Sequence, residues 1–142
     1  MKIPFVDLGL QYQSIKSEVY NEIHNVLNET AFIGGKRIKE FEVNFAEAIG
    51  VKHCIGVANG TDALVIALKM MGISEGDEVI VPANSFIATS EAVSAVGATV
   101  VFVDNYYDTY NIDCEKLNAT ITTKTKAVIA VHLYGQPADM DK

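Results

Sequence analysis

The sequence predicts an α/β fold with a mainly parallel sheet and flanking helices, and three observations lead to this class. From residue 53 onward, short apolar runs rich in β-branched residues alternate with segments that carry apolar residues at helical spacing. Successive runs begin about 21 to 28 residues apart, which is the spacing of β-α-β units with right-handed crossovers. No residue motif repeats from unit to unit, so the alternation is not a sequence repeat.

Residues 1–52, before this alternation, are predicted to be a helical N-terminal segment. Residues 14–30 (SIKSEVYNEIHNVLNET) carry apolar side chains three or four positions apart, which predicts an amphipathic helix with a charged outer face. The paired glycines of AFIGG interrupt this pattern. It resumes over residues 36–50, where Gly50 is predicted to end a second helix.

The second predicted domain, residues 53–142, contains the sheet. The predicted strands are His53–Ala58, Glu78–Val81, Thr99–Val103 and Ala127–His132, and the predicted helices are about 63–71, 85–96 and 113–121. Asp113 is expected to cap the last of these helices. The chain then turns at Gly135 and Pro137, reaches Asp139, a predicted helix N-cap, and ends three residues later at Lys142. Because a domain rarely ends at the first turn of a covering helix, we expect the chain to be part of a longer protein.

The composition of the 142 residues excludes several classes of protein. The chain is 49% hydrophobic and 20% charged, which is typical of a globular protein. Its net charge of -7 argues against a nucleic-acid partner. No apolar run approaches the ~20 residues that span a bilayer, and the start MKIPFVDLG lacks the apolar core of a signal peptide, so we expect a cytoplasmic protein without a membrane partner. Cys54 and Cys114 are expected to be reduced, and no metal site is expected.

The strand-to-helix junction at residues 59–62 (NGTD) is the first candidate binding site. Ligands of an open parallel sheet collect at the carboxyl ends of its strands, and a helix N-terminus offers phosphate free N–H groups and a positive dipole end. Gly60 allows close approach of the backbone, and Thr61 adds a hydroxyl group. The bland interpretation is that Thr61 or Asp62 only caps the helix. Spacing leaves both interpretations open, since the carboxylate of Asp62 would repel a phosphate unless it turned away.

Phe86 lies at the next strand-to-helix junction, in PANSFIATSEAV. An aromatic side chain at such an edge usually covers the core, but it can also stack on a planar ligand for about 0.5–1.5 kcal/mol beyond burial. A phosphate site and an aromatic platform on consecutive junctions together indicate a flat phosphorylated cofactor. His132 and Asp104 also end predicted strands. We interpret His132 as structural rather than as an acid–base group, and Asp104 as part of a turn.

Six blocks of the sequence resemble, in order and spacing, the opening of the DegT/DnrJ/EryC1/StrS family. These blocks are FVDLGLQY, FIGGKRIKEFEVNFAEAIG, NGTDALVIAL, VIVPANSFIATSEAV, VDNYYDTYNID and AVHLYGQPADM. Members of this family are pyridoxal-phosphate-dependent sugar aminotransferases of fold type I. The resemblance implies that residues 53–142 are the first part of the cofactor-binding large domain. It also implies a homodimer that acts in the biosynthesis of amino sugars and polysaccharides.

The resemblance implies a set of cofactor-binding residues for pyridoxal 5'-phosphate. Gly60, Thr61 and Asp62 match the turn that holds the phosphate, and Phe86 matches the aromatic residue that stacks on the pyridine ring. The family's Schiff-base lysine and the carboxylate opposite the pyridine nitrogen both lie beyond Lys142 in family order. No residue is therefore assigned a catalytic role, and residues 1–142 alone are expected to be inactive. Lysines that lie in predicted helices, before a predicted strand or, for the last one, too early in family order do not match the Schiff-base position. They include Lys36, Lys39, Lys69, Lys124, Lys126 and Lys142.

The activity implied by the resemblance is transfer of an amino group, with glutamate as the expected donor, to a nucleotide-linked keto-sugar. Two alternatives remain open. One is a sugar dehydratase of the same family in which histidine replaces the lysine. The other is a non-catalytic regulator that retains the fold. The residue at the lysine position, beyond residue 142, distinguishes the three.

Overall fold

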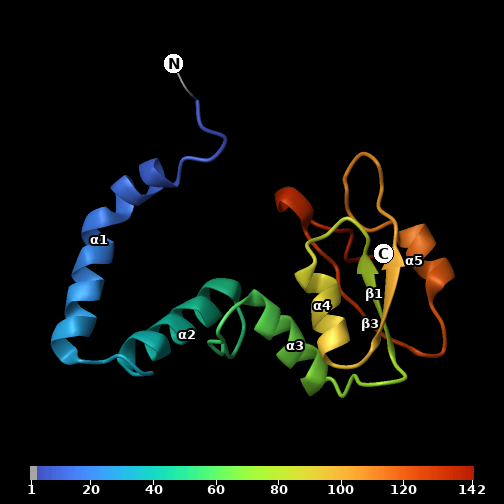
Figure 1. Ribbon diagram of the computed structural model, residues 1–142, viewed down its shortest axis with the longest axis horizontal. Helices are drawn as coiled ribbons and strands as arrows, with labels where there is room; N and C mark the ends of the chain where they lie inside the picture. Colours follow the sequence, from blue (N-terminus) through green and yellow to red (C-terminus); the bar gives the residue numbers. More distant parts are fainter. Residues whose placement is uncertain (1–2) are drawn as a thin grey trace. The chain divides into compact units, whose positions relative to one another are not determined.

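A computed structural model describes residues 3–142, which divide into two compact units (Figure 1). The first unit ends at Gly56, and the second, which we call the α/β unit, begins at Val57. The boundary predicted from the sequence lies between residues 52 and 53. Within the described residues, every helix is too short or too polar to cross a bilayer.

The first unit contains two helices, α1 (Leu8–Glu29) and α2 (Lys36–Ile49). The amphipathic pattern that predicted the first helix from residue 14 underestimates its length by about two turns, because the helix begins where Asp7 accepts a hydrogen bond from the N–H of Leu10 at 2.9 Å. The second helix ends as predicted at Gly50, whose φ of 74° is left-handed and therefore suits glycine.

The α/β unit contains a three-stranded parallel sheet in the order β2-β1-β3, which confirms the predicted fold class. Its elements, in chain order, are α3 (Gly60–Met70), β1 (Glu78–Pro82), α4 (Ala88–Ala95), β2 (Thr99–Val103), α5 (Cys114–Thr120), β3 (Thr125–Val128) and the 3₁₀ turn η1 (Leu133–Gly135). Asp113 caps α5 as predicted, because its carboxylate accepts hydrogen bonds from the N–H groups of Glu115 and Lys116.

The two faces of the sheet are covered by different helices, as expected for β-α-β units. Figure 1 shows α3 and α4 side by side near one face of the sheet, with α5 apart from them. Alternate residues of β1 serve the two faces: Val79 and Val81 pack in a cluster with residues of α3 and α4, whereas Ile80 packs in a cluster with Val103 and Ile112. The central strand is therefore buried on both sides.

The predicted strand His53–Ala58 is wrong, since the structure assigns no strand to these residues. A strand exists only where its N–H and C=O groups meet those of a neighbouring strand, and the described residues provide no such partner for this segment. Its one described hydrogen bond to a side chain runs from the N–H of Gly56 to Glu42 Oε1, at 2.8 Å. Apolar, β-branched residues are thus not sufficient to make a strand.

The last strand begins and ends earlier than the predicted Ala127–His132. β3 pairs with β1 from Thr125, and the N–H of Ile129 donates to the carbonyl of Ile80 at 2.9 Å. The next residue of β1 that faces β3 is Pro82, which has no N–H to continue the ladder. Pairing therefore stops after Ile129, and residues 130–132 continue without strand pairing.

Candidate active site

The junction before α3 is a helix N-terminus, as predicted, but its cap is Asn59 rather than Thr61 or Asp62. Asn59 Oδ1 accepts a hydrogen bond from the N–H of Asp62 at 2.8 Å, and Asn59 Nδ2 donates to Asp62 Oδ2 at 3.1 Å. The first of these bonds is that of a capping box, but the second joins the two side chains and does not reach the backbone N–H of Asn59. The second bond turns the carboxylate of Asp62 toward the cap, and the first occupies the Asp62 N–H.

Gly60 and Thr61 offer the free backbone donors of this junction. Within residues 3–142, neither N–H has an acceptor, as is usual for the first turn of a helix. No heavy atom lies within 4 Å of the position that a Cβ of Gly60 would take, so the backbone is open to a bound group. The two N–H groups and the positive end of α3 suit a phosphate. Binding through the N–H of Asp62 would also require Asn59 to release it.

Phe86 lies in the loop between β1 and α4, and its side chain is 77% exposed. Phe86 therefore does not cover the core. An aromatic ring buried in the core could not stack on a ligand, so its exposure leaves that role open. The loop is anchored at both ends by backbone hydrogen bonds, from Ala83 N–H to Val103 O at 2.9 Å and from Thr89 N–H to Phe86 O at 3.0 Å. The ring is thus presented to solvent from a loop whose two ends are held by backbone hydrogen bonds.

Replacing Asn59 by alanine is expected to lower the free energy of unfolding of the α/β unit by about 0.5–2 kcal/mol, because the change removes the side-chain acceptor for the Asp62 N–H. Urea denaturation followed by circular dichroism measures the change. Asn118→Ala on the exposed surface of α5 is the control, since no hydrogen bond of the Asn118 side chain is described within residues 3–142. Equal stability of the two variants would show that Asn59 is not the cap that stabilises α3.

Asp104 forms an ion pair at the carboxyl end of β2. Its Oδ2 lies 2.8 Å from Lys116 Nζ, and its Oδ1 accepts the N–H of Asn105 at 2.9 Å. The hydrogen bond from Lys116 lowers the pKa of the Asp104 carboxyl, and the same contact raises the pKa of Lys116. Both groups are thereby held in their charged forms. Asp104 is a fixed carboxylate of this turn rather than a proton donor, and Lys116 is engaged as its partner.

His132 has a structural contact of the kind the sequence analysis favoured. Its Nδ1 accepts a hydrogen bond from the N–H of Ala138 at 3.0 Å. This bond joins His132, in the segment after β3, to the buried Ala138 six positions later. This contact uses Nδ1 alone, and no hydrogen bond of Nε2 is described within residues 3–142.

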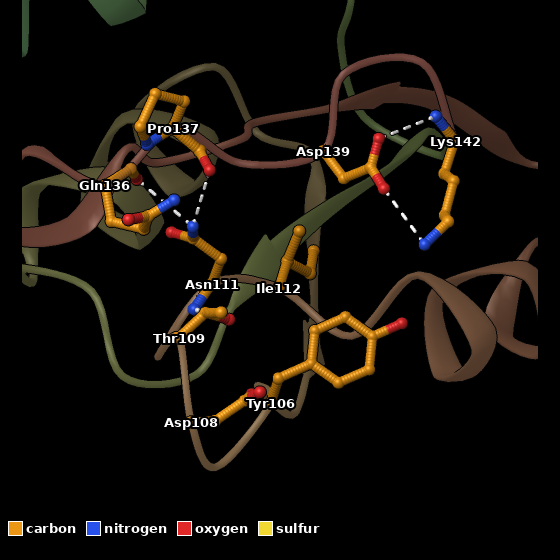
Figure 2. Close-up of a pocket in the computed structure, with 9 residues that line it drawn as sticks. All are labelled: Tyr106, Asp108, Thr109, Asn111, Ile112, Gln136, Pro137, Asp139 and Lys142. Carbon is orange, nitrogen blue, oxygen red and sulfur yellow. Dashed lines mark hydrogen bonds and ion pairs between the residues drawn. The ribbon is translucent and has the colours of Figure 1, made fainter.

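A cleft of about 340 Å³ lies between the loop after β2 and the last residues of the chain (Figure 2). Its lining includes none of the four predicted cofactor-binding residues. At its base is Asn111, which is buried and donates from Nδ2 to the carbonyls of Gln136 at 3.1 Å and Pro137 at 2.8 Å. Asn111 Oδ1 accepts the N–H of Leu133 at 3.4 Å. Asp139 and Lys142 face each other across 3.0 Å at the rim.

Two tyrosines beside Asn111 have left-handed backbones, which is uncommon for large side chains. Tyr110 has φ of 59° and Tyr134 has φ of 55°, and their rings meet edge to face with centroids 6.3 Å apart. The carbonyl of Tyr110 accepts a hydrogen bond from Asn84 Nδ2 at 2.9 Å. Asn84 and Asn111 were not predicted as site residues, because their partners lie 22 to 26 residues away in the chain and leave no local signal.

The structure defines an α/β domain with a parallel sheet, a class of fold in which ligands collect at the carboxyl ends of the strands. The family model for the DegT/DnrJ/EryC1/StrS aminotransferase family matches residues 13–142. The chain therefore belongs to this family.

The chain is similar to several proteins along nearly its whole length. It is 46% identical to dTDP-3-amino-3,6-dideoxy-alpha-D-galactopyranose transaminase of Aneurinibacillus thermoaerophilus, over 98% of this chain and 38% of the relative. It is 44% identical to the pleiotropic regulatory protein of Geobacillus stearothermophilus, over 99% of this chain and 38% of the relative. It thus spans well under half the length of these relatives.

Solved structures agree with the fold. S. venezuelae DesV matches with a TM-score of 0.95 and 42% identity, over 99% of this chain and 38% of that chain. The structure of ntda from Bacillus subtilis, with bound cofactor PMP, matches with a TM-score of 0.94 and 36% identity, over 99% of this chain and 32% of that chain. Neighbours of this fold therefore include a protein that holds an aminated cofactor.

Proposed function

We propose that this chain contributes the phosphate and ring contacts for pyridoxal 5'-phosphate in an aminotransferase that acts on a nucleotide-linked keto-sugar. Family membership supports the reaction class, and the relatives named as sugar transaminases support the substrate class. Glutamate as the amino donor, a homodimeric assembly, a cytoplasmic location and a role in polysaccharide biosynthesis belong to the same proposal and rest on the resemblance.

The observation that carries the proposal is the pairing of free donors at the start of α3 with an exposed aromatic ring in the loop between β1 and α4. Gly60 and Thr61 present N–H groups without acceptors among the described residues, at a backbone with open space in front of it. Phe86 presents a ring that the core does not use. The N–H groups suit the phosphate of a phosphorylated pyridine, and the phenyl ring suits the flat face of its aromatic ring.

The chain's residues would bind and orient the cofactor rather than transfer protons. The donors of Gly60 and Thr61 would fix the phosphate, and Phe86 would hold the ring by stacking on its face. When bound, the cofactor supplies an electron sink that makes amino transfer possible. Asp104 and Lys116 are paired with each other within the α/β unit. The assignment of proton transfer to residues beyond Lys142 rests on the family resemblance.

The test of the proposed function is amino transfer by the protein at its full encoded length. The protein is first loaded with pyridoxal phosphate and then mixed with glutamate and nucleotide-linked keto-sugars, and the aminated sugar is identified by mass spectrometry. Formation of an amino sugar is the expected result. Loss of oxygen from the sugar without amination would favour the dehydratase. Cofactor binding with neither reaction would favour the regulator, the alternative for which the Geobacillus stearothermophilus relative gives a precedent by name.

Replacing Phe86 by alanine is expected to weaken binding of pyridoxamine phosphate about tenfold, because the ring loses its stacking partner. Pyridoxamine phosphate is chosen because it carries no aldehyde, so its affinity reports non-covalent contacts alone. Isothermal titration calorimetry on the full-length protein gives the dissociation constant. Phe102→Ala, at an exposed phenylalanine of β2, is the matched control and should bind as the wild type does. An unchanged affinity of Phe86→Ala would exclude the ring as a platform.

A further inference from the structure

Three loops leave the carboxyl ends of the parallel strands, and hydrogen bonds tie them to one another. Residues 83–87 follow β1, residues 104–113 follow β2, and residues 129–138 follow β3. Because the strands are parallel, these segments begin at the same edge of the sheet. The second of these loops contacts both of the others, through its neighbouring residues Tyr110 and Asn111.

At Tyr110, whose backbone is left-handed, and at the next residue, this loop forms hydrogen bonds with the loops after β1 and after β3. The carbonyl of Tyr110 accepts Asn84 Nδ2 at 2.9 Å, from the loop after β1. The next side chain, Asn111, donates to the carbonyls of Gln136 and Pro137 in the segment after β3. A left-handed tyrosine persists only where its surroundings hold it, and here they include a 3.0 Å hydrogen bond from its N–H to Tyr106 O.

The side chains of the loop that carries Phe86 make one other described hydrogen bond. Ser85 Oγ donates to Pro82 O at 3.1 Å, a contact within the same turn. Among the side-chain hydrogen bonds described for residues 83–87, the one from Asn84 reaches another loop. Since Phe86 is 77% exposed, core packing does not fix its ring. The direction in which the ring faces therefore depends on how its backbone is held.

We propose that Asn84 is a positioning residue, whose amide fixes the Phe86 loop against the Tyr110 carbonyl and so preorganises the ring for a planar phosphorylated cofactor. This inference rests on the proposed function, because it assumes that Phe86 meets the cofactor. Holding a binding group in its bound orientation raises affinity by lowering the cost of ordering it. Asn84 itself is exposed, so its hydrogen bond contributes little to the core and its loss leaves the α/β unit folded.

The experiment measures pyridoxamine phosphate binding by the full-length protein in three variants. Asn84→Ala removes the donor without adding charge, Asn84→Gln retains an amide donor, and Asn118→Ala removes an exposed asparagine amide from α5. We expect Asn84→Ala to bind about threefold to tenfold more weakly, the range for one lost hydrogen bond, and to change the induced circular dichroism of the bound ring. Asn84→Gln should recover part of both signals, and Asn118→Ala should match the wild type.

The outcomes separate the inference from the function on which it rests. If the wild-type protein does not bind pyridoxamine phosphate, the proposed function fails. If the wild type binds and Asn84→Ala matches it in affinity and ring dichroism, the positioning role is wrong. A loss of affinity accompanied by a large fall in melting temperature, which glutamine does not restore, would also overturn the inference, because it would show a purely structural role. Weaker binding with an unchanged melting temperature supports it.

Discussion

Replacing Ile80 by alanine is expected to lower the free energy of unfolding of the α/β unit by about 2–5 kcal/mol. Ile80 lies at the centre of β1, its side chain is fully buried, and it packs with Val103 and Ile112 on the α5 side of the sheet. Alanine would leave a cavity in addition to removing buried apolar surface. Because β1 pairs with both other strands, the structure around the cavity has little freedom to collapse.

Urea denaturation of the full-length protein, followed by fluorescence and circular dichroism, measures this loss. Ile66→Ala is the matched control: Ile66 lies on α3 with 46% of its surface exposed, and alanine has the higher helix propensity. We expect the control to change stability by less than about 1 kcal/mol. A loss for Ile80→Ala no greater than that of the control would mean that the second cluster does not stabilise the sheet.

The alternation of apolar runs and helical patterns predicts the α/β unit well. The helices form their hydrogen bonds locally, and three of the predicted strands find partners in the same sheet. β2 has the predicted bounds, and β1 extends one residue further, to Pro82. The segment 53–58 shows where this reasoning fails. Its residues have the composition of a strand, but strand formation depends on a partner, and composition carries no information about the partner.

In the candidate site too, contacts between residues close in the sequence could be predicted, and contacts between distant residues could not. The Asn59 cap could have been predicted, because an asparagine three residues before an aspartate at a helix start resembles a capping box. Of the two interpretations left open for this junction, the capping one names Thr61 or Asp62, the residues that follow Asn59. The links from Asn84 and Asn111 could not have been predicted, since each joins loops that only the parallel sheet brings together. From the sequence alone, Asp104 in the loop after β2 is interpreted as part of a turn.

Replacing Asn111 by alanine is expected to destabilise the α/β unit on the order of 3 kcal/mol, because each buried group left without a partner costs about 1–3 kcal/mol. The change would free the carbonyls of Gln136 and Pro137 and the N–H of Leu133. Gln136 and Pro137 are exposed, so water would replace part of the loss at their carbonyls. The local consequence is the more specific one: residues 129–138 would lose their tie to the loop after β2.

Hydrogen–deuterium exchange of the full-length protein separates this local effect from a general loss of stability. Asn111→Ala should exchange faster at residues 129–138 and at 104–111, while α3 and α4 keep the protection of the wild type, since their cluster lies on the other face of the sheet. Asn118→Ala, on the same unit, should leave all of these segments unchanged. Uniformly faster exchange across the α/β unit would instead make Asn111 a residue of the general fold. Faster exchange confined to the two loops would identify it as the link that holds the loops after β2 and β3 together.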